Sequence, residues 1–400
     1  MSEEAKNTDG ANQDPNEQCL LTIDKETLTP LVRSALSSDT VDVIDWEYLS
    51  IYGGYGGARI YRFTGNASDG DENVEWSLIL KIIPTSFDSE HPFVSSDFVS
   101  SDDVRAILHE PLVYQSGFLN DLPYGLAAPR CFSVVEHPDG TFWLWLEDVK
   151  DEIGEWPLER YGFTAHQFGQ FNGSYLTGQR TLPSLLMKTD IHRKWASVSR
   201  RIEQLPDSLE HPLVCCAFPP ELANELIRLW ADHEVFLDAL DSLPQTFCHH
   251  DVHRGNMFAR CGVDGREQTV MIDWQGAGMG AIGGEMGSFI SKGFVLDPEP
   301  GAAQELDKTV FDGYLAGLHD VGWRDDTRIV RLGCLAVSIL RWMFICPGFI
   351  LQSALDESRH TEFEQRFERS MEEVMVGFAD PLRFHLELAD EARRLLDSIC

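Results

Sequence analysis

The sequence of 400 residues contains little positive charge. Lysine and arginine together number 32, against 65 aspartates and glutamates, and the formal net charge is −33. A chain with this charge repels nucleic acids and anionic membrane surfaces, so we expect neither as a partner. Acidic residues outnumber basic ones on both sides of Asp148. This spread favours a property of the whole surface over a local pocket for a polycationic ligand.

The sequence also lacks a secretion signal and an apolar run long enough to cross a bilayer. Residues 1–18 show no basic segment followed by an apolar one, and we predict a disordered tail there. The run WMFICPGFIL is interrupted by Pro347 and Gly348 and is too short to span a membrane. These absences predict a soluble, cytoplasmic protein. They leave its oligomeric state open.

Several motifs of cysteine, metal and nucleotide chemistry are missing. The nine cysteines show no C-x-x-C spacing, are odd in number, and lie in stretches predicted as core or helix. This pattern is typical of reduced, buried thiols. Neither H-E-x-x-H nor the P-loop motif G-x-x-x-x-G-K-[ST] occurs. D-F-G and A-P-E are also absent, which argues against a protein kinase.

The segment between Cys248 and Trp274 does contain a pattern suited to chemistry. It reads CHHDVHRGNMF and, after a polar connector, TVMIDW. Transfer of a phosphoryl group requires oxygen ligands for magnesium and a carboxylate beside the acceptor hydroxyl. We predict that Asp251 orients and deprotonates the acceptor, and that Asn256 and Asp273 hold the metal. His249 is predicted to support their positions, without acting as an acid or a base.

Two other interpretations of this segment remain open. His249, His250, Asp251 and His253 could together bind zinc or iron, as in a metal hydrolase. No further motif completes such a site, and elemental analysis of the purified protein would detect the metal. The segment could also be purely structural.

This segment resembles the catalytic loop and metal-binding strand of the aminoglycoside phosphotransferase and choline kinase superfamily. The loop in that superfamily usually reads H-G-D-x-H-P-G-N, whereas this chain has His250 and Arg254 at the glycine and proline positions. Where the family often has an aspartate opening a helix, GGEMG offers Glu285, which we interpret as structural.

The resemblance implies an α+β, protein-kinase-like fold with two lobes, and a chain of this length also predicts more than one core. We expect a small antiparallel-sheet lobe that binds nucleotide over residues 19–148. A larger, mainly helical lobe over residues 149–400 would carry catalysis and the acceptor pocket.

The first lobe is predicted to begin with a helix over Glu26–Leu36, capped by Asp24. Strands over Val41–Ile51 and Ala58–Phe63 then flank the sequence GGYGG. Such a turn lets backbone amides approach a phosphate closely, although an ordinary hairpin turn has the same composition. We predict that it covers the nucleotide through its four glycines, Gly53, Gly54, Gly56 and Gly57.

After a polar insertion, GNASDGDEN, a strand over EWSLILKIIP places Lys81 among apolar residues. A buried lysine requires a fixed anion, which in kinase-like lobes is a nucleotide phosphate together with a helix carboxylate. We predict Glu110 as that carboxylate, on a helix over Ser101–Leu119 in which Asp102 and Asp103 act as caps. Alternatively, Lys81 extends to water from an edge strand.

Two further strands, CFSVVE and TFWLWLEDV, are joined by the turn residues HPDG. The second strand ends where a kinase-like chain crosses between lobes. We therefore predict that the backbone near Glu147 and Val149 binds the adenine edge. Glu147 and Asp148 could equally serve only to solvate this linker.

Apolar positions at helical spacing predict that most of the remaining chain is helical. The expected helices cover Thr164–Thr177, Lys188–Leu205, Pro219–Leu243, Ala302–Gly317, Asp326–Phe344, Thr361–Phe378 and Pro381–Ile399. Aromatic residues such as Trp323, Trp342 and Phe349 could line an acceptor pocket, but core packing is the favoured interpretation.

Together these features predict a kinase that moves the γ-phosphoryl group of ATP, or of GTP, to a hydroxyl of a small molecule with the help of Mg²⁺. The alternative is a pseudokinase that binds nucleotide and acts as a scaffold without turnover. The acceptor is not identified: an aminoglycoside, another antibiotic, choline, ethanolamine and a sugar all remain candidates.

Overall fold

The structure is a computed structural model that describes residues 20–51, 58–84, 109–182, 186, 191–262, 265–295 and 302–399. The tail 1–18 lies outside the described residues. So do Asp102, Asp103 and the predicted turn with Gly53, Gly54, Gly56 and Gly57.

Internal contacts divide the chain into two units, which we call the sheet unit and the helical unit. The sheet unit comprises Met1–Pro84 and Arg130–Asp148, and the helical unit comprises Thr85–Pro129 and Val149–Cys400. The sequence analysis places all of residues 19–148 in the first lobe. The structure instead places residues 109–129 with the helical unit, because α3 (His109–Gln115) and β4 (Leu126–Ala127) bond to elements of that unit.

The sheet unit contains a five-stranded antiparallel sheet with the order β1-β2-β3-β6-β5. Before it lies α1 (Lys25–Leu36), which begins after Asp24, whose carboxylate accepts a hydrogen bond from the Thr27 amide at 2.8 Å. The helix and its cap are as predicted. The strands are β1 (Val41–Ile51), β2 (Arg59–Asp69), β3 (Glu72–Ile83), β5 (Cys131–Glu136) and β6 (Phe142–Glu147).

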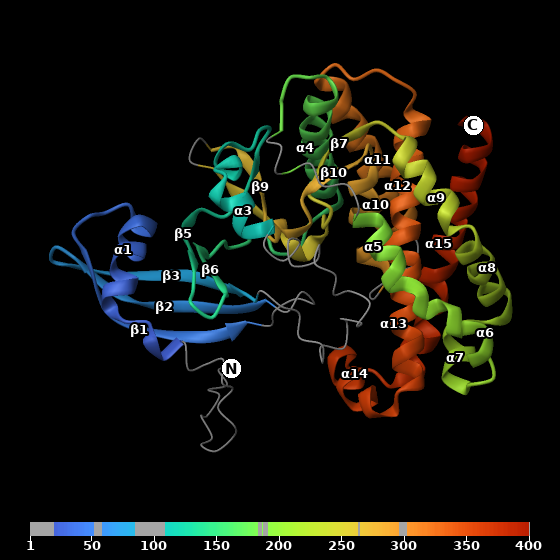
Figure 1. The fold of residues 1–400 in the computed structure, drawn as a ribbon, viewed down its shortest axis with the longest axis horizontal. Coiled ribbons are helices and arrows are strands. Elements are labelled where there is room, and N and C mark those ends of the chain that lie inside the picture. Colours follow the sequence, from blue (N-terminus) through green and yellow to red (C-terminus); the bar gives the residue numbers. More distant parts are fainter. Residues whose placement is uncertain are drawn as a thin grey trace. The chain divides into compact units, whose positions relative to one another are not determined.

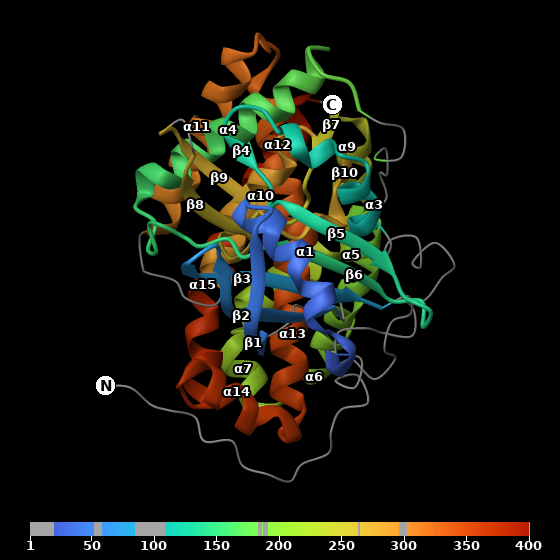
Figure 2. The same cartoon turned by 90° about the vertical axis from the view of Figure 1, so that its left-hand side faces the viewer.

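The core of the sheet unit lies between α1 and one face of the sheet (Figures 1 and 2). From α1, Leu28 and Val32 are fully buried, and they belong to the same cluster as Phe63, Leu80 and Trp145 of the sheet. Burying a side chain of this size stabilises the fold by about 1.5–3 kcal/mol. The face of β2 and β3 that packs against α1 is therefore the apolar face of the sheet.

The segment GNASDGDEN is not the polar insertion that the sequence analysis expects. Strand β2 continues to Asp69, strand β3 begins at Glu72, and Gly70 and Asp71 form the turn between them. Gly70 has a φ of 63°, a left-handed conformation that favours glycine in tight hairpins. The polar residues pair through their backbones, so low hydrophobicity did not prevent strand formation.

The helical unit consists mainly of helices, with two small sheets (Figure 1). One sheet has the order β4-β9-β8 and the other pairs β10 with β7. The strands are β7 (Gln245–Cys248), β8 (Met257–Cys261), β9 (Glu267–Met271) and β10 (Gly278–Ala281). The principal helices are α4 (Leu158–Leu176), α5 (Ile191–Val198), α7 (Pro212–Ala217), α8 (Pro220–Ala231), α9 (His233–Ser242), α10 (Gly284–Val295), α11 (Ala302–Asp320), α12 (Thr327–Val337), α13 (Phe344–Leu355), α14 (His360–Phe367) and α15 (Met371–Ile399).

Helices α4 and α11 pack with their backbones in close approach. A Cβ atom added at Gly169 would lie 2.1 Å from the Tyr314 carbonyl oxygen, and one at Gly317 would lie 2.0 Å from the His166 carbonyl oxygen. Only glycine fits at either position. The close crossing brings the hydroxyl of Tyr314 to Asn172, where it donates a hydrogen bond of 2.8 Å.

Most predicted helices are present, but several boundaries differ. The segment Pro219–Leu243 divides at Asp232 into α8 and α9. Near the carboxyl end, the predicted break at Pro381 is wrong because that proline lies inside α15. The chain instead breaks before α15, where Glu368 takes a left-handed backbone with a φ of 51°.

A longer helical stretch than expected runs from Thr327 to Leu355. By length and composition alone it could cross a membrane, with a mean hydropathy of 2.0 over its most apolar window, but 78% of that window is buried inside the structure. This burial is typical of a core helix. The spacing of apolar residues predicts an end at Phe344, but the structure continues from the π-helix Ser338–Met343 into α13, which contains Pro347.

The cysteines differ partly from the prediction. Of the seven in the described residues, only Cys248 and Cys334 are buried, whereas Cys215 and Cys261 are exposed. Cys215 lies in the short helix α7 and Cys261 ends β8. The expectation of uniformly buried thiols is therefore wrong.

Candidate functional site

The H-x-D-x-x-x-x-N segment forms a loop between β7 and β8 of the helical unit. Strand β7 ends at Cys248, a 3-10 turn covers Arg254–Asn256, and β8 then pairs with β9. After β9, the amide of Ile272 donates a hydrogen bond of 3.0 Å to the carbonyl oxygen of Asn256. This hairpin brings Asn256 close to Asp273, which follows Ile272 directly.

Asp251 lies at the centre of these contacts. Its Oδ2 accepts a hydrogen bond of 2.7 Å from Asn256 Nδ2, which also donates to the Asp251 carbonyl oxygen at 3.1 Å. Its Oδ1 pairs with the guanidinium of Arg341 and lies 3.4 Å from His253 Nε2. The structure therefore brings together Asp251 and Asn256, two of the residues predicted from the sequence.

His249 connects the loop to the following strand. Its Nδ1 accepts the Asp251 amide at 3.2 Å, so Nε2 carries the proton and donates to the Ile272 carbonyl oxygen at 3.0 Å. Burial lowers the pKa of His249 to about 4, which keeps the imidazole neutral. Trp274 covers the ring, with centroids 4.5 Å apart. These contacts suit the predicted positioning role.

His250 occupies the glycine position of the loop H-G-D-x-H-P-G-N. The backbone conformation of His250 explains why a glycine suits this position. The residue has a φ of 65°, in the left-handed region that favours glycine. Its Nε2 bonds to the Met279 carbonyl oxygen at 3.1 Å, and its ring packs against His192 of α5. Burial lowers the pKa of His250 to about 3, so this ring is also neutral.

A buried carboxylate supports the loop from behind. Glu285, in the first turn of α10, accepts hydrogen bonds from the His249 amide and from Asn172 Nδ2, the latter at 2.9 Å. Asn172 in turn accepts from Tyr314. Burial raises the pKa of Glu285 to about 7. Its contacts agree with the structural interpretation of this residue.

Asn256 and Asp273 fit a magnesium ion by their chemistry. Asn256 donates two hydrogen bonds from Nδ2 to Asp251, so Oδ1 is the atom that can face a cation. Asp273 ends the β9 segment in a left-handed turn with a φ of 64°. An amide oxygen and a carboxylate are ligands that magnesium prefers.

The zinc or iron alternative receives no support from the geometry. The imidazoles of His249 and His250 bond to the carbonyl oxygens of Ile272 and Met279, whereas Nδ1 of His253 accepts from the Gly255 amide at 3.0 Å. Within the described ranges, no group of three or more His, Cys, Asp or Glu residues could hold a metal ion.

Lys81 is buried in β3 of the sheet unit, with 7% of its surface exposed. Strand β3 pairs with β2 on one side and with β6 on the other, which excludes the alternative of an edge-strand lysine. Glu110 belongs to the helical unit, where its Oε1 accepts the Trp274 amide at 3.2 Å. The pairing of Lys81 with Glu110 stays a prediction, because the two residues lie in separate units.

The end of β6 is more strongly bonded within the sheet unit than expected. The Glu147 amide donates to the Arg130 carbonyl oxygen at 2.9 Å, and its carboxylate accepts the Arg130 amide at 3.0 Å. Asp148 pairs with Arg62 at 2.9 Å and is almost buried, so it does not simply solvate a linker. Val149 opens the second segment of the helical unit, and its predicted nucleotide contact is untested.

Arg341 is a site residue that was not predicted from the sequence. This residue lies in the π-helix Ser338–Met343 and bonds to both Asp251 and His250. Its guanidinium also lies 4.0 Å from the ring centroid of Trp195 and 5.0 Å from that of Trp342. In the sequence, the available signal was that Arg341 is a single charged residue within the apolar segment ILRWMF. Its neighbours Met343 and Phe344 are buried core residues.

Comparisons with known proteins address the identity of this site. The model of a family described as the phosphotransferase enzyme family matches residues 120–323, which is more than half of the chain. The match includes Asp251, Asn256 and Asp273, whereas Lys81 and Arg341 lie outside it. A search of curated proteins finds no match.

Solved structures of similar shape include an aminoglycoside phosphotransferase from Alicyclobacillus acidocaldarius. It is 13% identical, with a TM-score of 0.49, and the alignment covers 92% of this chain and 96% of that one. A spectinomycin phosphotransferase in complex with ADP and spectinomycin is 12% identical, with a TM-score of 0.46 and coverages of 92% and 99%.

Proposed function

We propose, since this chain belongs to the phosphotransferase enzyme family, that it moves the γ-phosphoryl group of ATP, or of GTP, to a hydroxyl group of a small molecule. The observation that carries the proposal is the arrangement around Asp251. Its carboxylate is held by Asn256 at 2.7 Å, and the β8–β9 hairpin places Asp273 beside Asn256. One base and two oxygen ligands within one loop and one hairpin are what phosphoryl transfer requires.

In this proposal Asp251 orients the acceptor hydroxyl and accepts its proton. Asn256 and Asp273 would hold Mg²⁺, which when bound neutralises charge on the phosphates. His249 keeps the loop and the strand in register through its two ring nitrogens. All four of these residues belong to the helical unit.

The nucleotide is assigned mainly to the sheet unit. We propose that Lys81 binds phosphate oxygens and pairs with Glu110, and that the turn Gly53–Gly57 covers the phosphates. The main chain near Glu147 and Val149 would contact adenine. The protein is proposed to act in the cytoplasm, without nucleic acid or membrane partners.

The proposal is tested by incubating the protein with ATP or GTP, Mg²⁺ and a library of hydroxylated small molecules. We expect one class of compound to gain the mass of one phosphate, detected by mass spectrometry, and Asp251→Asn to abolish the gain. The library should include aminoglycosides, choline, ethanolamine and sugars. Failure of every class with both nucleotides, for a folded protein that binds them, would overturn the proposal.

The pseudokinase alternative predicts nucleotide binding without turnover. Loss of the base or of a metal ligand would favour it, but Asp251, Asn256 and Asp273 are all present in this chain. Slow, magnesium-dependent ATP hydrolysis in the absence of acceptor distinguishes the two. A scaffold would bind nucleotide and hydrolyse none.

A further inference from the structure

Arg341 holds two consecutive residues of the catalytic loop. One of its terminal nitrogens, Nη1, donates to the His250 carbonyl oxygen and, at 3.1 Å, to Ser288 Oγ of α10. The other, Nη2, donates to Asp251 Oδ1. We propose that Arg341 is a positioning residue that orients the Asp251 carboxylate towards the acceptor hydroxyl. This inference rests on the proposed function.

The geometry of the carboxylate supports this role. Arg341 binds Oδ1, and Asn256 binds Oδ2 at 2.7 Å, so hydrogen bonds reach both oxygens from two different elements. Two donors on opposite oxygens restrict rotation of the carboxylate plane. A planar guanidinium has donors in fixed directions, which an ammonium group lacks. The position of the Asp251 oxygens is therefore determined before any substrate arrives.

Arg341 is itself held rigidly. Its side chain is 10% exposed and lies against the ring of Trp195 on α5 and beside that of Trp342. The negative face of an aromatic ring attracts a cation, and the attraction is stronger when the cation is desolvated. The guanidinium thus receives support from α5, from α10 through Ser288, and from the loop that it binds. Because Arg341 is held in place, its hydrogen bond to Oδ1 also holds the Asp251 carboxylate in place.

The π-helix explains how the side chain reaches the loop. Arg341 lies in the π-helix Ser338–Met343, between α12 and α13. A π turn contains one residue more than an α turn, and each residue turns an α-helix by about 100°. Without the extra residue, Arg341 would face a different side of the helix. The irregular turn is therefore part of the arrangement, and such turns are frequent at functional sites.

Two substitutions separate positioning from simple structural support. Arg341→Lys keeps the charge but not the fixed fork, and Arg341→Ala leaves a space that a guanidinium ion can fill. We expect both to lower kcat by about 10- to 100-fold, since a small misplacement of a reacting group costs this much. The KM for nucleotide should stay within about twofold of the wild-type value, because the phosphates are proposed to bind elsewhere. Guanidinium chloride at low millimolar concentration should restore part of the kcat of Arg341→Ala.

Arg328→Gln provides the matched control. Arg328 lies in the first turn of α12, is exposed, and pairs only locally with Asp326 among the contacts that the structure describes. The kcat of Arg328→Gln should equal that of the wild type and should not change when guanidinium chloride is added. Thermal melts and circular dichroism show whether each variant folds. If Arg341→Ala does not fold, Arg341→Lys carries the test alone through its kcat and KM.

The outcomes distinguish the inference from the function on which it rests. A wild-type protein without phosphotransfer or hydrolysis would overturn the proposed function. An active wild type whose Arg341→Lys variant keeps its full kcat would overturn the positioning role only. A fall in kcat with equal loss of nucleotide affinity would assign Arg341 to general stability, and would also contradict the inference.

Discussion

At the scale of single residues, Asp251 combines two requirements in one side chain. It must face a substrate, and it must also neutralise the buried guanidinium of Arg341, with which it forms an ion pair. Removing one partner of a buried pair leaves an uncompensated charge. Substitutions here therefore affect stability and catalysis together, and the two must be measured separately.

We predict that Asp251→Ala lowers turnover by about 10²- to 10⁴-fold, in line with the loss of a general base. Nucleotide affinity should be nearly unchanged, because the proposed nucleotide contacts lie elsewhere. Calorimetric binding of a non-hydrolysable nucleotide and steady-state kinetics measure the two effects. Asp397→Ala, at an exposed position on α15, is the control. Near wild-type turnover in Asp251→Ala would remove this residue from the proposed role.

His250 and Gly280 form a second, structural pair. A Cβ atom added at Gly280 would lie 2.3 Å from His250 Cε1 and 3.2 Å from Cys248 Sγ. We predict that Gly280→Ala lowers the free energy of unfolding by about 1–3 kcal/mol through overpacking. In a His250→Gly background the same substitution should cost less than about 1 kcal/mol, since the main obstacle is gone.

Urea unfolding of the two single variants and the double variant measures this coupling. Additive effects would show that the imidazole moves aside in Gly280→Ala and that the two positions are independent.

Only some of the residues of this site could be predicted from the sequence. The spacing of His249, Asp251, Asn256 and Asp273 reflects a local loop and hairpin, so it is readable from the chain. Arg341 lies 90 residues beyond Asp251 along the chain. Only tertiary packing brings them together, and no local pattern specifies that distance. The left-handed backbone of His250 is likewise visible only in three dimensions.

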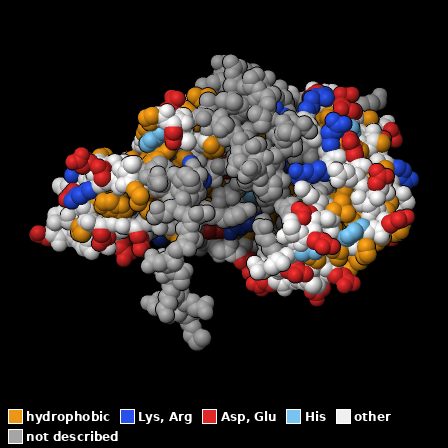
Figure 3. All heavy atoms as spheres, turned by 60° about the horizontal axis from the view of Figure 1, so that its bottom comes forward, with side chains coloured by type: hydrophobic (Ala, Val, Ile, Leu, Met, Phe, Trp, Pro, Cys, Tyr) orange, Lys and Arg blue, Asp and Glu red, His pale blue; other side chains and the backbone are white. Residues whose placement is uncertain are grey.

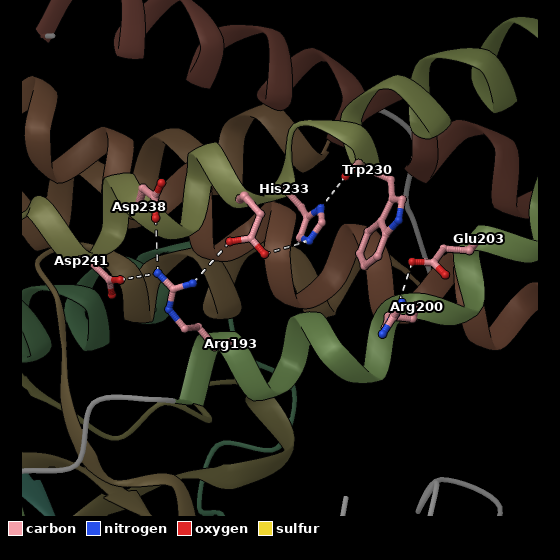
Figure 4. A network of polar contacts seen from close by, with 8 residues as sticks. Arg193, Arg200, Glu203, Trp230, His233, Asp238 and Asp241 are labelled. Atoms are coloured by element: carbon pink, nitrogen blue, oxygen red, sulfur yellow. Dashed lines mark hydrogen bonds and ion pairs between the residues drawn. The ribbon is translucent and has the colours of Figure 1, made fainter. Parts of the chain in front are cut away.

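At the scale of helices and strands, the support of the site depends on how helix α5 is held. Helix α5, which carries His192 and Trp195, is joined to α9 by Arg193, whose guanidinium contacts Glu234, Asp238 and Asp241 (Figure 4). The shortest of these contacts is 2.6 Å, to Asp241. Exposed ion pairs of this kind contribute little stability singly, but several together define the direction of a short helix.

Two glycines in helices, Gly317 and Gly377, give a prediction about stability together with its control. We expect Gly317→Ala to lower the free energy of unfolding by about 1–3 kcal/mol, because its Cβ would lie 2.0 Å from the backbone of α4. Gly377→Ala in α15 meets no atom within 4 Å, so better helix propensity should raise stability by about 0.5–1 kcal/mol.

Thermal or urea unfolding of both variants tests this contrast. Equal effects would mean that α4 and α11 can separate at little cost. Loss of stability in Gly377→Ala alone would contradict the whole argument from packing.

Helix and strand positions were largely predictable because amphipathic spacing is a local property. The strand Val41–Ile51 and the helix ending at Leu36 have the boundaries expected from the sequence. The π-helix at Ser338–Met343 and the continuous α15 were not predicted. Both depend on how neighbouring helices accommodate an extra residue or a proline, which single-sequence periodicity does not encode.

At the scale of the whole molecule, the predicted α+β fold class and the family assignment are confirmed. Acidic side chains are scattered over both units on the face shown in Figure 3. This distribution agrees with the interpretation of the charge as a property of the whole surface.

The pH dependence of folding stability follows from buried titratable groups. Burial lowers the pKa values of His249 to about 4 and of His250 to about 3, and that of His192 well below 6.5. Below about 6.5 the unfolded chain binds these protons and the folded protein does not, so the free energy of unfolding falls as pH is lowered towards 4.

Glu285 opposes this trend. Its folded pKa of about 7 lies above the usual 4.5, so between these values the folded state holds a proton that the unfolded chain has lost. Stability from this group decreases as pH rises through that window. Three imidazoles outweigh one carboxyl, and we predict net destabilisation by acid from these four groups.

Urea unfolding of the wild type and of His250→Gly between pH 7.5 and 4.5 measures the effect. The variant lacks one of the three neutral imidazoles, so its stability should fall less steeply with acid. Parallel curves for the two proteins would show that His250 titrates alike in the folded and unfolded states.

The interleaving of the two units limits how the gene can be divided. The chain leaves the sheet unit after Pro84, returns at Arg130 and departs again after Asp148. A fragment ending at Asp148 would carry β4 and α3 away from β9 and Trp274, to which they bond. The remaining fragment would lose a strand from its three-stranded sheet. The second fragment alone is therefore incomplete, so split or chimeric versions of this protein require residues 109–129 to stay with the helical unit.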